Sequence, residues 1–125
     1  MIVGIGTDMV TIARMAEKLQ NTGDRFARRL LTEAEYREFA GKRNGAAFLA
    51  KRFAAKEAAV KALGTGFADG ITWQQVAVSN DDRGAPRLQL SGPALQRAEQ
   101  LGVQRLHLSL SDEREHALAF VILER

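Results

Sequence analysis

The pattern of apolar and polar positions changes its period about halfway along the chain. Up to Leu63 the apolar residues mostly recur at helical spacing, whereas from Trp73 onward they alternate as in half-buried strands. The first segment is the exception, because Ile2 to Asp8 is Gly-rich and uncharged until its last residue, which predicts a buried strand. The pattern therefore predicts one strand, then helices, then hairpins.

Helical segments make up most of the first half. Apolar spacing and Gly breaks predict helices at residues 11–21, 25–31, 32–41 and 44–63. Thr32 and Glu35 have the spacing of a capping box at the start of the third helix, and Gly64 ends the fourth and longest.

The second half predicts two hairpins separated by a helix. Its strands cover residues 73–79, 87–90, 106–111 and 116–124, and Pro93 lies in the first turn of the intervening helix, which ends at Gly102. No repeat, linker or low-complexity stretch interrupts the pattern. We expect a single α+β domain over residues 1–125, with a mainly antiparallel sheet packed against the long helix.

Composition excludes several classes of protein. The 125 residues include no cysteine, which rules out disulfides, Cys-ligated zinc and thiol chemistry and suits a reducing compartment. The longest apolar run, Ala117 to Leu123, is too short to span a bilayer, and the N-terminal segment lacks the basic region of a signal peptide. We expect a cytoplasmic protein with no membrane partner.

Basic residues are concentrated in the first half of the chain. The net charge of +3 combines 12 Lys and Arg against 6 Asp and Glu between Arg14 and Lys61 with 6 against 9 elsewhere. Such an excess fits a docking surface for an acidic protein, a phosphate or a nucleic acid, and equally a solvated helical surface. Nucleic acid is the weakest of these interpretations, because no helix-turn-helix or RNA-binding motif is present.

Asp8 is the only charged residue among the first thirteen, and it ends the predicted buried strand. A carboxylate in that position needs a compensating partner. One interpretation is a ligand for a hard cation, which prefers carboxylate oxygens. The other is a helix N-cap or an ion pair with Arg14.

Three charged residues on the long helix lie between apolar and small positions. Lys56 falls within the apolar stripe, Glu57 lies at its edge, and Lys61 follows one turn later. Two lysines flanking a glutamate, near Asp8, suit a metal-bound phosphate, with the carboxylates on the metal and the lysines neutralising the remaining charge. The alternative is an i,i+4 ion pair between Glu57 and Lys61, with Lys56 extending to solvent.

Two further motifs each allow a chemical and a plain interpretation. The Gly-Thr-Gly turn at residues 64–66 either offers backbone N–H groups to a phosphate or simply ends the helix. His107 shares one strand face with Ser109 and Ser111, where a hydrogen-bonded sheet residue is more common than a metal ligand. With two histidines in the chain, a His-rich metal site is excluded.

These motifs occur together and in order. Gly4-Ile5-Gly6-Thr7-Asp8 precedes Phe53-Ala54-Ala55-Lys56-Glu57-Ala58-Ala59-Val60-Lys61, and Gly84-Ala85-Pro86 and His107-Leu108-Ser109-Leu110-Ser111-Asp112 follow. In this combination the chain strongly resembles the holo-[acyl-carrier-protein] synthases, the small bacterial type of 4′-phosphopantetheinyl transferase, from Met1 to Glu124. Thr7 stands where many members have an aliphatic residue.

The resemblance implies a reaction. The phosphopantetheine arm of coenzyme A would pass to a serine of apo-acyl carrier protein, with release of adenosine 3′,5′-bisphosphate, as a step of fatty acid biosynthesis. Asp8 and Glu57 would hold Mg²⁺ on the CoA pyrophosphate, and Glu57, directly or through a metal-bound water, would help to deprotonate the serine. Lys61 would stabilise or protonate the leaving phosphate.

The resemblance also implies binding residues and an assembly. The CoA-binding residues would be Arg52, Lys56, Lys61, Gly64, Thr65, Gly66, Pro86 and His107. The acidic carrier would dock on Arg14, Arg25, Phe26 and Arg29. Members are homotrimers with each site between protomers. The competing hypothesis is a non-catalytic basic module that docks an acidic protein, which would use the basic patch but would have no use for Asp8, Glu57 or Lys61.

Overall fold

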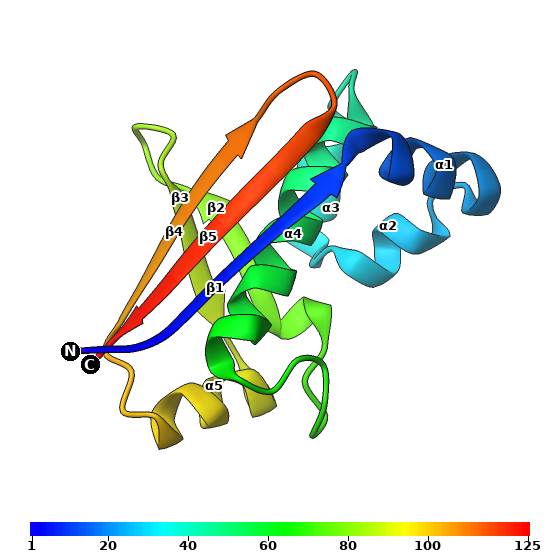
Figure 1. Cartoon of the computed structure of the whole chain (residues 1–125). Helices are drawn as coiled ribbons and strands as arrows, with labels where there is room; N and C mark the ends of the chain where they lie inside the picture. The colour runs from blue at the N-terminus through cyan, green and yellow to red at the C-terminus, as the bar shows by residue number, and fades with distance from the viewer.

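The computed structural model describes all 125 residues and contains five strands, five α-helices and one 3-10 turn (Figure 1). The first half consists of β1 (Ile2–Thr11), α1 (Ile12–Thr22), α2 (Arg25–Leu30), α3 (Glu33–Ala40) and α4 (Gly45–Leu63). The second half consists of η1 (Trp73–Gln75), β2 (Val76–Asn80), β3 (Pro86–Leu90), α5 (Gly92–Gln100), β4 (Arg105–Asp112) and β5 (His116–Glu124). The α+β class and the predicted order of the elements are confirmed.

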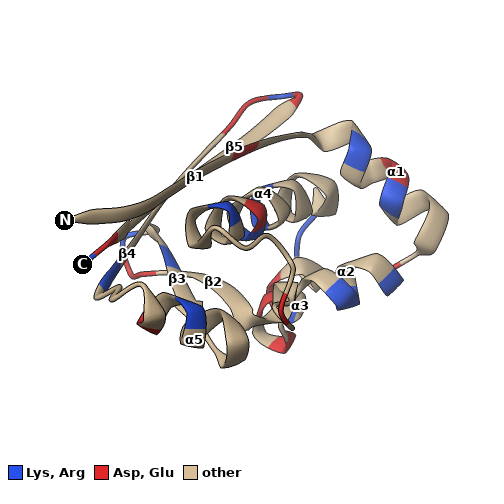
Figure 2. Ribbon diagram, turned by 60° about the horizontal axis from the view of Figure 1, so that its bottom comes forward, with Lys and Arg blue, Asp and Glu red and all other residues tan.

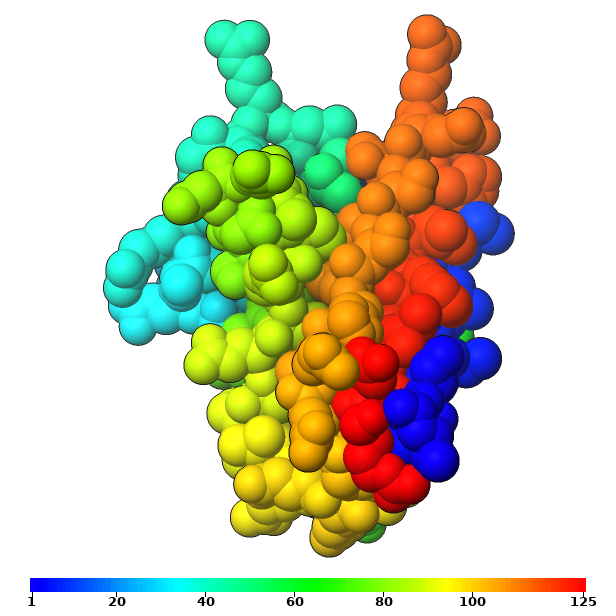
Figure 3. Space-filling view, turned by 90° about the vertical axis from the view of Figure 1, so that its left-hand side faces the viewer, coloured from blue at the N-terminus to red at the C-terminus, as the bar shows by residue number.

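The strands form two antiparallel sheets. One has the order β1-β5-β4, and the other is the separate hairpin β2-β3. Figure 3 shows β4, β5 and β1 side by side on one face of the molecule, next to the β2–β3 hairpin. Because β1 and β5 pair along their whole length, the chain ends meet: the Met1 amino group lies 2.9 Å from the Arg125 carbonyl oxygen.

Helix α4 is the centre of the fold. Thirteen of its nineteen residues are buried, because β1 and β5 cover one side while the smaller helices and β2 cover the others. The Asn44 side chain caps its first turn, and Gly64 ends it in the left-handed conformation with φ at 79°, as the sequence predicts. No helix of the protein, α4 included, is long and apolar enough to cross a membrane.

Two glycines allow β1 to lie directly against α4. A Cβ atom on Gly6 would overlap the carbonyl oxygen of Ala58, and one on Gly4 would overlap that of Ala62. Any residue larger than glycine would therefore hold the strand away from the helix. This close approach sets the position of Asp8, two residues further along β1.

Two predictions about strands are wrong. β1 is not buried on both faces: it runs to Thr11, and Ile5 and Met9 are 61% and 64% exposed on the side of the sheet away from α4. The strand predicted from Trp73 begins only at Val76, because Trp73 to Gln75 form a 3-10 turn. An apolar run predicts a strand from local spacing alone. Which faces of the strand are covered, and at which residue it begins, depend on the packing.

Candidate active site

Asp8, Glu57 and Lys61 come together where β1 crosses α4. From Gly4 to Val10, the even-numbered residues of β1 face the helix, and Glu57 and Lys61 lie one turn apart on it. The Lys61 Nζ lies 3.1 Å from Asp8 Oδ1 and 3.0 Å from the carbonyl oxygen of Thr7. Asp8 therefore pairs with Lys61 rather than with Arg14, and no i,i+4 ion pair joins Glu57 to Lys61.

The two carboxylates of this site are short of partners. Asp8 Oδ2 is buried and accepts no hydrogen bond. Burial and the nearby charge of Asp8 raise the pKa of Glu57, and Lys61, the Trp73 side chain and Arg14 only partly offset this. An orphaned carboxylate oxygen beside a second, destabilised carboxylate is an arrangement that an added positive charge would stabilise.

A hard divalent cation such as Mg²⁺ fits these residues. Asp8 and Glu57 would supply two carboxylates, and no group of three or more His, Asp or Glu side chains surrounds the position. Mg²⁺ is commonly held by one or two carboxylates and completes its shell with water and substrate phosphates. The protein thus offers the part of a coordination shell that a metal-bound phosphate would complete.

Lys56, next to Glu57 in sequence, has quite different surroundings. Its side chain is fully buried, and Nζ lies 2.7 Å from Glu35 Oε1, 2.8 Å from the Leu30 carbonyl oxygen and 3.1 Å from that of Trp73. All three ammonium donors are therefore used inside the chain. The interpretation that Lys56 extends to solvent is wrong, because the packing around α4 leaves no path to the surface.

Lys56 belongs to a group of three buried charged residues, Glu35, Arg52 and Lys56, which we call the buried charge cluster. Arg52 NH1 lies 3.3 Å from Glu35 Oε2 and also donates to the Val78 carbonyl oxygen, while NH2 lies 3.1 Å from Glu38. Glu35 also accepts from backbone N–H groups, that of Thr32 at 2.7 Å and that of Val78 at 2.8 Å. The predicted capping box is thus confirmed, and its glutamate has a second role.

The Gly64-Thr65-Gly66 turn uses its backbone donors on α4. The N–H of Gly64 donates to the Lys61 carbonyl oxygen, and those of Thr65 and Gly66 donate to the Val60 carbonyl oxygen. The plain interpretation of the turn, a helix end, is confirmed. The turn still adjoins Lys61 and so borders the carboxylate site.

His107 does not lie in the same site as Asp8 within one chain. Its side chain is on the outer face of the β1-β5-β4 sheet, where Nε2 lies 3.0 Å from Glu124 Oε1. Asp8 faces the opposite side, toward α4. The plain interpretation of His107 as a hydrogen-bonded sheet residue thus holds within one chain. Pro86 is remote in another way, because it starts β3 in the separate hairpin, paired with Asn80.

The predicted carrier-docking residues lie on α1 and α2. Arg14, Arg25 and Arg29 are exposed, and Figure 2 shows Lys and Arg positions along both helices. Phe26, in contrast, is only 7% exposed and packs against Phe53 and Trp73, so its ring supports the surface from beneath.

Cationic side chains cover this aromatic group. The Arg14 guanidinium lies 5.1 Å from the centroid of the Phe53 ring, Lys18 Nζ lies 5.5 Å from that of Phe26, and the Arg29 guanidinium lies 6.0 Å from that of Trp73. Such stacking holds the charges in place over an apolar base. Lys18 is not among the docking residues predicted from the sequence, although its spacing of four from Arg14 on one helix face is a usable signal.

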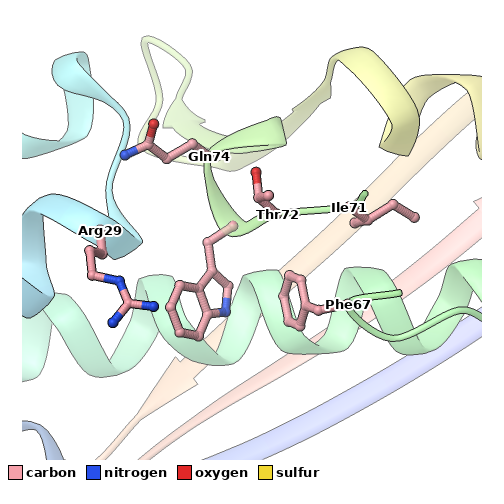
Figure 4. Close-up of a pocket in the computed structure, with 6 residues that line it drawn as sticks. Arg29, Phe67, Ile71, Thr72 and Gln74 are labelled. Carbon is pink, nitrogen blue, oxygen red and sulfur yellow. The ribbon is translucent and has the colours of Figure 1, made fainter. Parts of the chain in front are cut away.

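A pocket of about 450 Å³ opens between α2 and the segment that follows α4 (Figure 4). Its lining consists of Arg29, Phe67, Ile71, Thr72, Trp73 and Gln74. In the close-up, Arg29 reaches in from α2 and Phe67 lies on the opposite side. Phe67 and Trp73 are not among the site residues predicted from the sequence, because two aromatic residues between a Gly-rich turn and a strand do not by themselves distinguish a core from a pocket wall.

Fold and site together define a transferase of phosphopantetheine type: the chain belongs to the 4′-phosphopantetheinyl transferase superfamily, which it matches over residues 4–121. It is 53% identical over 125 residues to the holo-[acyl-carrier-protein] synthase of Vibrio cholerae, covering 100% of this chain and 99% of that protein.

Solved structures agree with this assignment. The holo-[acyl-carrier-protein] synthase of Neisseria meningitidis superposes with a TM-score of 0.91 at 42% identity, with 100% of both chains covered. The enzyme of Bacillus anthracis, solved in complex with CoA (3′,5′-ADP), gives 0.83 at 38% identity, covering 98% of this chain and 96% of that one. The family expected from the sequence is confirmed.

Proposed function

We propose that this protein is a holo-[acyl-carrier-protein] synthase, which transfers 4′-phosphopantetheine from coenzyme A to a serine of apo-acyl carrier protein in the cytoplasm, for fatty acid biosynthesis. The observation that carries the proposal is the under-coordinated pair of carboxylates, Asp8 and Glu57, beside Lys61 in a chain of this family. The CoA complex of the Bacillus anthracis relative supports the choice of donor.

The chemistry is a displacement at the pyrophosphate of CoA. The serine oxygen forms a bond to the phosphorus that carries pantetheine, while the bond from this phosphorus to the bridging oxygen breaks and the bridging oxygen leaves with adenosine 3′,5′-bisphosphate. Glu57, directly or through a metal-bound water, would help to remove the serine proton. The Lys61 ammonium stabilises or protonates the departing phosphate.

Asp8 and Glu57 would hold Mg²⁺, which when bound would neutralise the charge of the pyrophosphate. The support is the free Oδ2 of Asp8 and the mutual repulsion of the two carboxylates. Lys61 already neutralises one oxygen of Asp8, so the cation would take the other.

We propose that the working form is a homotrimer. The outer face of the β1-β5-β4 sheet exposes large apolar side chains: Ile5, Met9, Leu118 and Phe120 are 40% to 64% exposed. An apolar face of this kind is typical of a subunit interface. In the assembly, His107 and Pro86 of one copy would border the CoA site of the next, together with the turn at residues 64–66. Arg52 and Lys56, whose donors are used inside the chain, would not contact CoA.

The acidic carrier would dock on Arg14, Arg25 and Arg29, over the aromatic base that includes Phe26. Exposed charges interact over about 10 Å at 0.1 M salt. We therefore expect the KM for the carrier to rise with ionic strength more steeply than the KM for CoA. Arg25→Glu should raise the carrier KM and leave CoA binding intact, and an equal loss of both would contradict the docking assignment.

The deciding experiment is the intact mass of an apo-acyl carrier protein after incubation with this protein, CoA and Mg²⁺. We expect a gain of one phosphopantetheine, abolished by EDTA and restored by excess Mg²⁺. A carrier that binds but gains no mass would favour the non-catalytic docking module. A gain that survives EDTA would contradict the metal assignment while leaving the activity in place.

The assembly has its own test. Sedimentation velocity should give a trimer for the natural protein and monomers for Phe120→Glu, because a carboxylate on the outer sheet face cannot be buried without a partner. A matched exposed control is Leu95→Glu on α5, which should leave the trimer intact. A monomeric natural protein with full activity would contradict this part of the proposal.

A further inference from the structure

Lys56 is next to Glu57 on α4, but the proposed chemistry gives it no role. Its side chain is fully buried, and every donor of its ammonium has a partner within the chain. It therefore cannot contact CoA or the carrier in this conformation. What it contacts is informative, because its three partners belong to three different elements.

The two carbonyl partners of Lys56 belong to α2 and η1, the two segments that contribute Arg29 and Trp73 to the lining of the pocket. Leu30 is the last residue of α2 and follows Arg29, which lines one wall. Trp73 begins η1 and also lines the pocket. One buried ammonium thus bonds α2 and η1, at 2.8 Å and 3.1 Å, while its own position on α4 adjoins Glu57.

Glu35 fixes the direction of the Lys56 side chain. It lies 2.7 Å from Nζ and is itself held by Thr32 and Val78 backbone donors. A second, weaker connection runs parallel to the first: Gln74 Nε2 donates to the carbonyl oxygens of Arg28 at 2.9 Å and Leu31 at 3.2 Å. Gln74 is exposed, so this connection can be cut without disturbing the core.

We propose that Lys56, oriented by Glu35, is a positioning residue that sets the distance between the carrier-docking helix α2 and the Trp73 wall beside Glu57. The buried Lys56–Glu35 ion pair then holds the carrier-docking surface at a fixed position relative to Asp8 and Glu57. This proposal rests on the proposed function for its kinetic consequence, but the contacts between α2, α4 and η1 are independent of it.

The direct test is Lys56→Met, which keeps the length of the side chain and removes both carbonyl contacts. We expect the KM for the carrier to rise at least about tenfold, since each tenfold corresponds to about 1.4 kcal/mol, while the KM for CoA changes less than about twofold. Glu35→Gln should give the same split, because a neutral amide cannot serve all four donors now bonded to Glu35.

Glu38→Gln is the matched control. Glu38 lies on the same helix as Glu35 and contacts Arg52, but it contacts neither Lys56 nor either pocket wall. It should leave both KM values unchanged. Gln74→Ala keeps the proposal testable if the buried variants fail to fold, because it cuts the parallel connection at the surface and should raise the carrier KM about threefold.

A readout without catalysis separates this proposal from the proposed function. Trp73 is the only tryptophan of the chain, so its emission reports the position of the pocket wall. We expect a red shift in Lys56→Met and Gln74→Ala and none in Glu38→Gln, even if the natural protein transfers nothing. Unchanged emission and carrier KM in folded variants would overturn the proposal. So would an equal rise of both KM values, which would indicate that Lys56 acts on CoA or on the fold as a whole.

Discussion

Two neighbouring residues of α4 enter opposite environments. Lys56 joins the buried charge cluster, in which the single carboxylate of Glu35 receives four donors. Glu57 joins the carboxylate site, where Asp8 Oδ2 receives none. A buried charge whose partners are complete belongs to the architecture, whereas one left incomplete is a place for a ligand. The comparison separates structural from chemical residues within one motif.

The pKa shifts of the two glutamates make the same distinction. Burial alone would raise the pKa of Glu35, but the charge of Lys56 and the hydrogen bonds from Lys56, Thr32 and Val78 outweigh it, so its pKa is lowered. Burial raises the pKa of Glu57, the negative charge of Asp8 raises it further, and Lys61 offsets these effects only in part. The fold thus favours the charge on one glutamate and opposes it on the other.

The largest expected effect is on catalysis at the carboxylate site. Glu57→Gln should lower kcat/KM by about a thousandfold or more, because it removes both a base and half of the cation site. Its free energy of unfolding should stay equal or rise, since repulsion with Asp8 disappears. Transfer assays and urea unfolding check both parts, and retention of full activity in Glu57→Gln would exclude the proposed role.

The buried charge cluster should respond in the opposite way. Glu35→Ala should lower the free energy of unfolding by about 3–5 kcal/mol, because it leaves Lys56 and Arg52 buried without their shared carboxylate. Glu38→Ala, at a half-exposed position, should lower it by less than about 1 kcal/mol. Urea unfolding at one fixed protein concentration measures both, and equal losses would mean that burial does not distinguish the two carboxylates.

A smaller loss of stability should follow from moving β1 away from α4, since these two elements carry Asp8 and Glu57. Gly6→Ala inserts a methyl group between β1 and α4 and should lower stability by about 1–3 kcal/mol. Activity should fall as well, because Asp8 moves away from Glu57. Gly41→Ala is the control, since its nearest neighbour would lie 3.7 Å away in ordinary contact. Equal unfolding midpoints for the two variants would contradict the close packing of β1 on α4.

The smallest effect is the pH dependence, for which the two glutamates have opposite signs. The folded pKa of Glu57 is above its usual 4.5, so its contribution to stability is present below pH 4.5 and is lost as pH rises through the folded value. The folded pKa of Glu35 is below 4.5, so its contribution is present above pH 4.5 and is lost as pH falls through the folded value.

In the metal-free protein, the difference in unfolding free energy between the natural protein and Glu57→Gln should therefore fall as pH rises, whereas the difference from Glu35→Gln should fall as pH is lowered. Urea unfolding of the three proteins in EDTA at a series of pH values measures both differences. Differences that change with the same sign would contradict the assignment. The stability profile of Glu57→Gln should lack the component that is lost as pH rises.

Much of the fold followed from local patterns. The capping box of Thr32 and Glu35 and the left-handed Gly64 occur where the sequence predicts them. These signals act within a few residues and need no tertiary context. Trp73 shows the limit, since its apolar run was predicted as a strand but begins with a 3-10 turn.

The candidate site divides in the same way. The sequence by itself determined the residue types: two carboxylates and two lysines in the family motif, and a basic first half. Tertiary structure decided their partners, because pairs such as Asp8 with Lys61 and Glu35 with Lys56 are 53 and 21 residues apart. Spacing along the helix allowed a Glu57–Lys61 ion pair as one of two interpretations. Because β1 packs on α4, Lys61 instead pairs with Asp8, and no ion pair forms at Glu57.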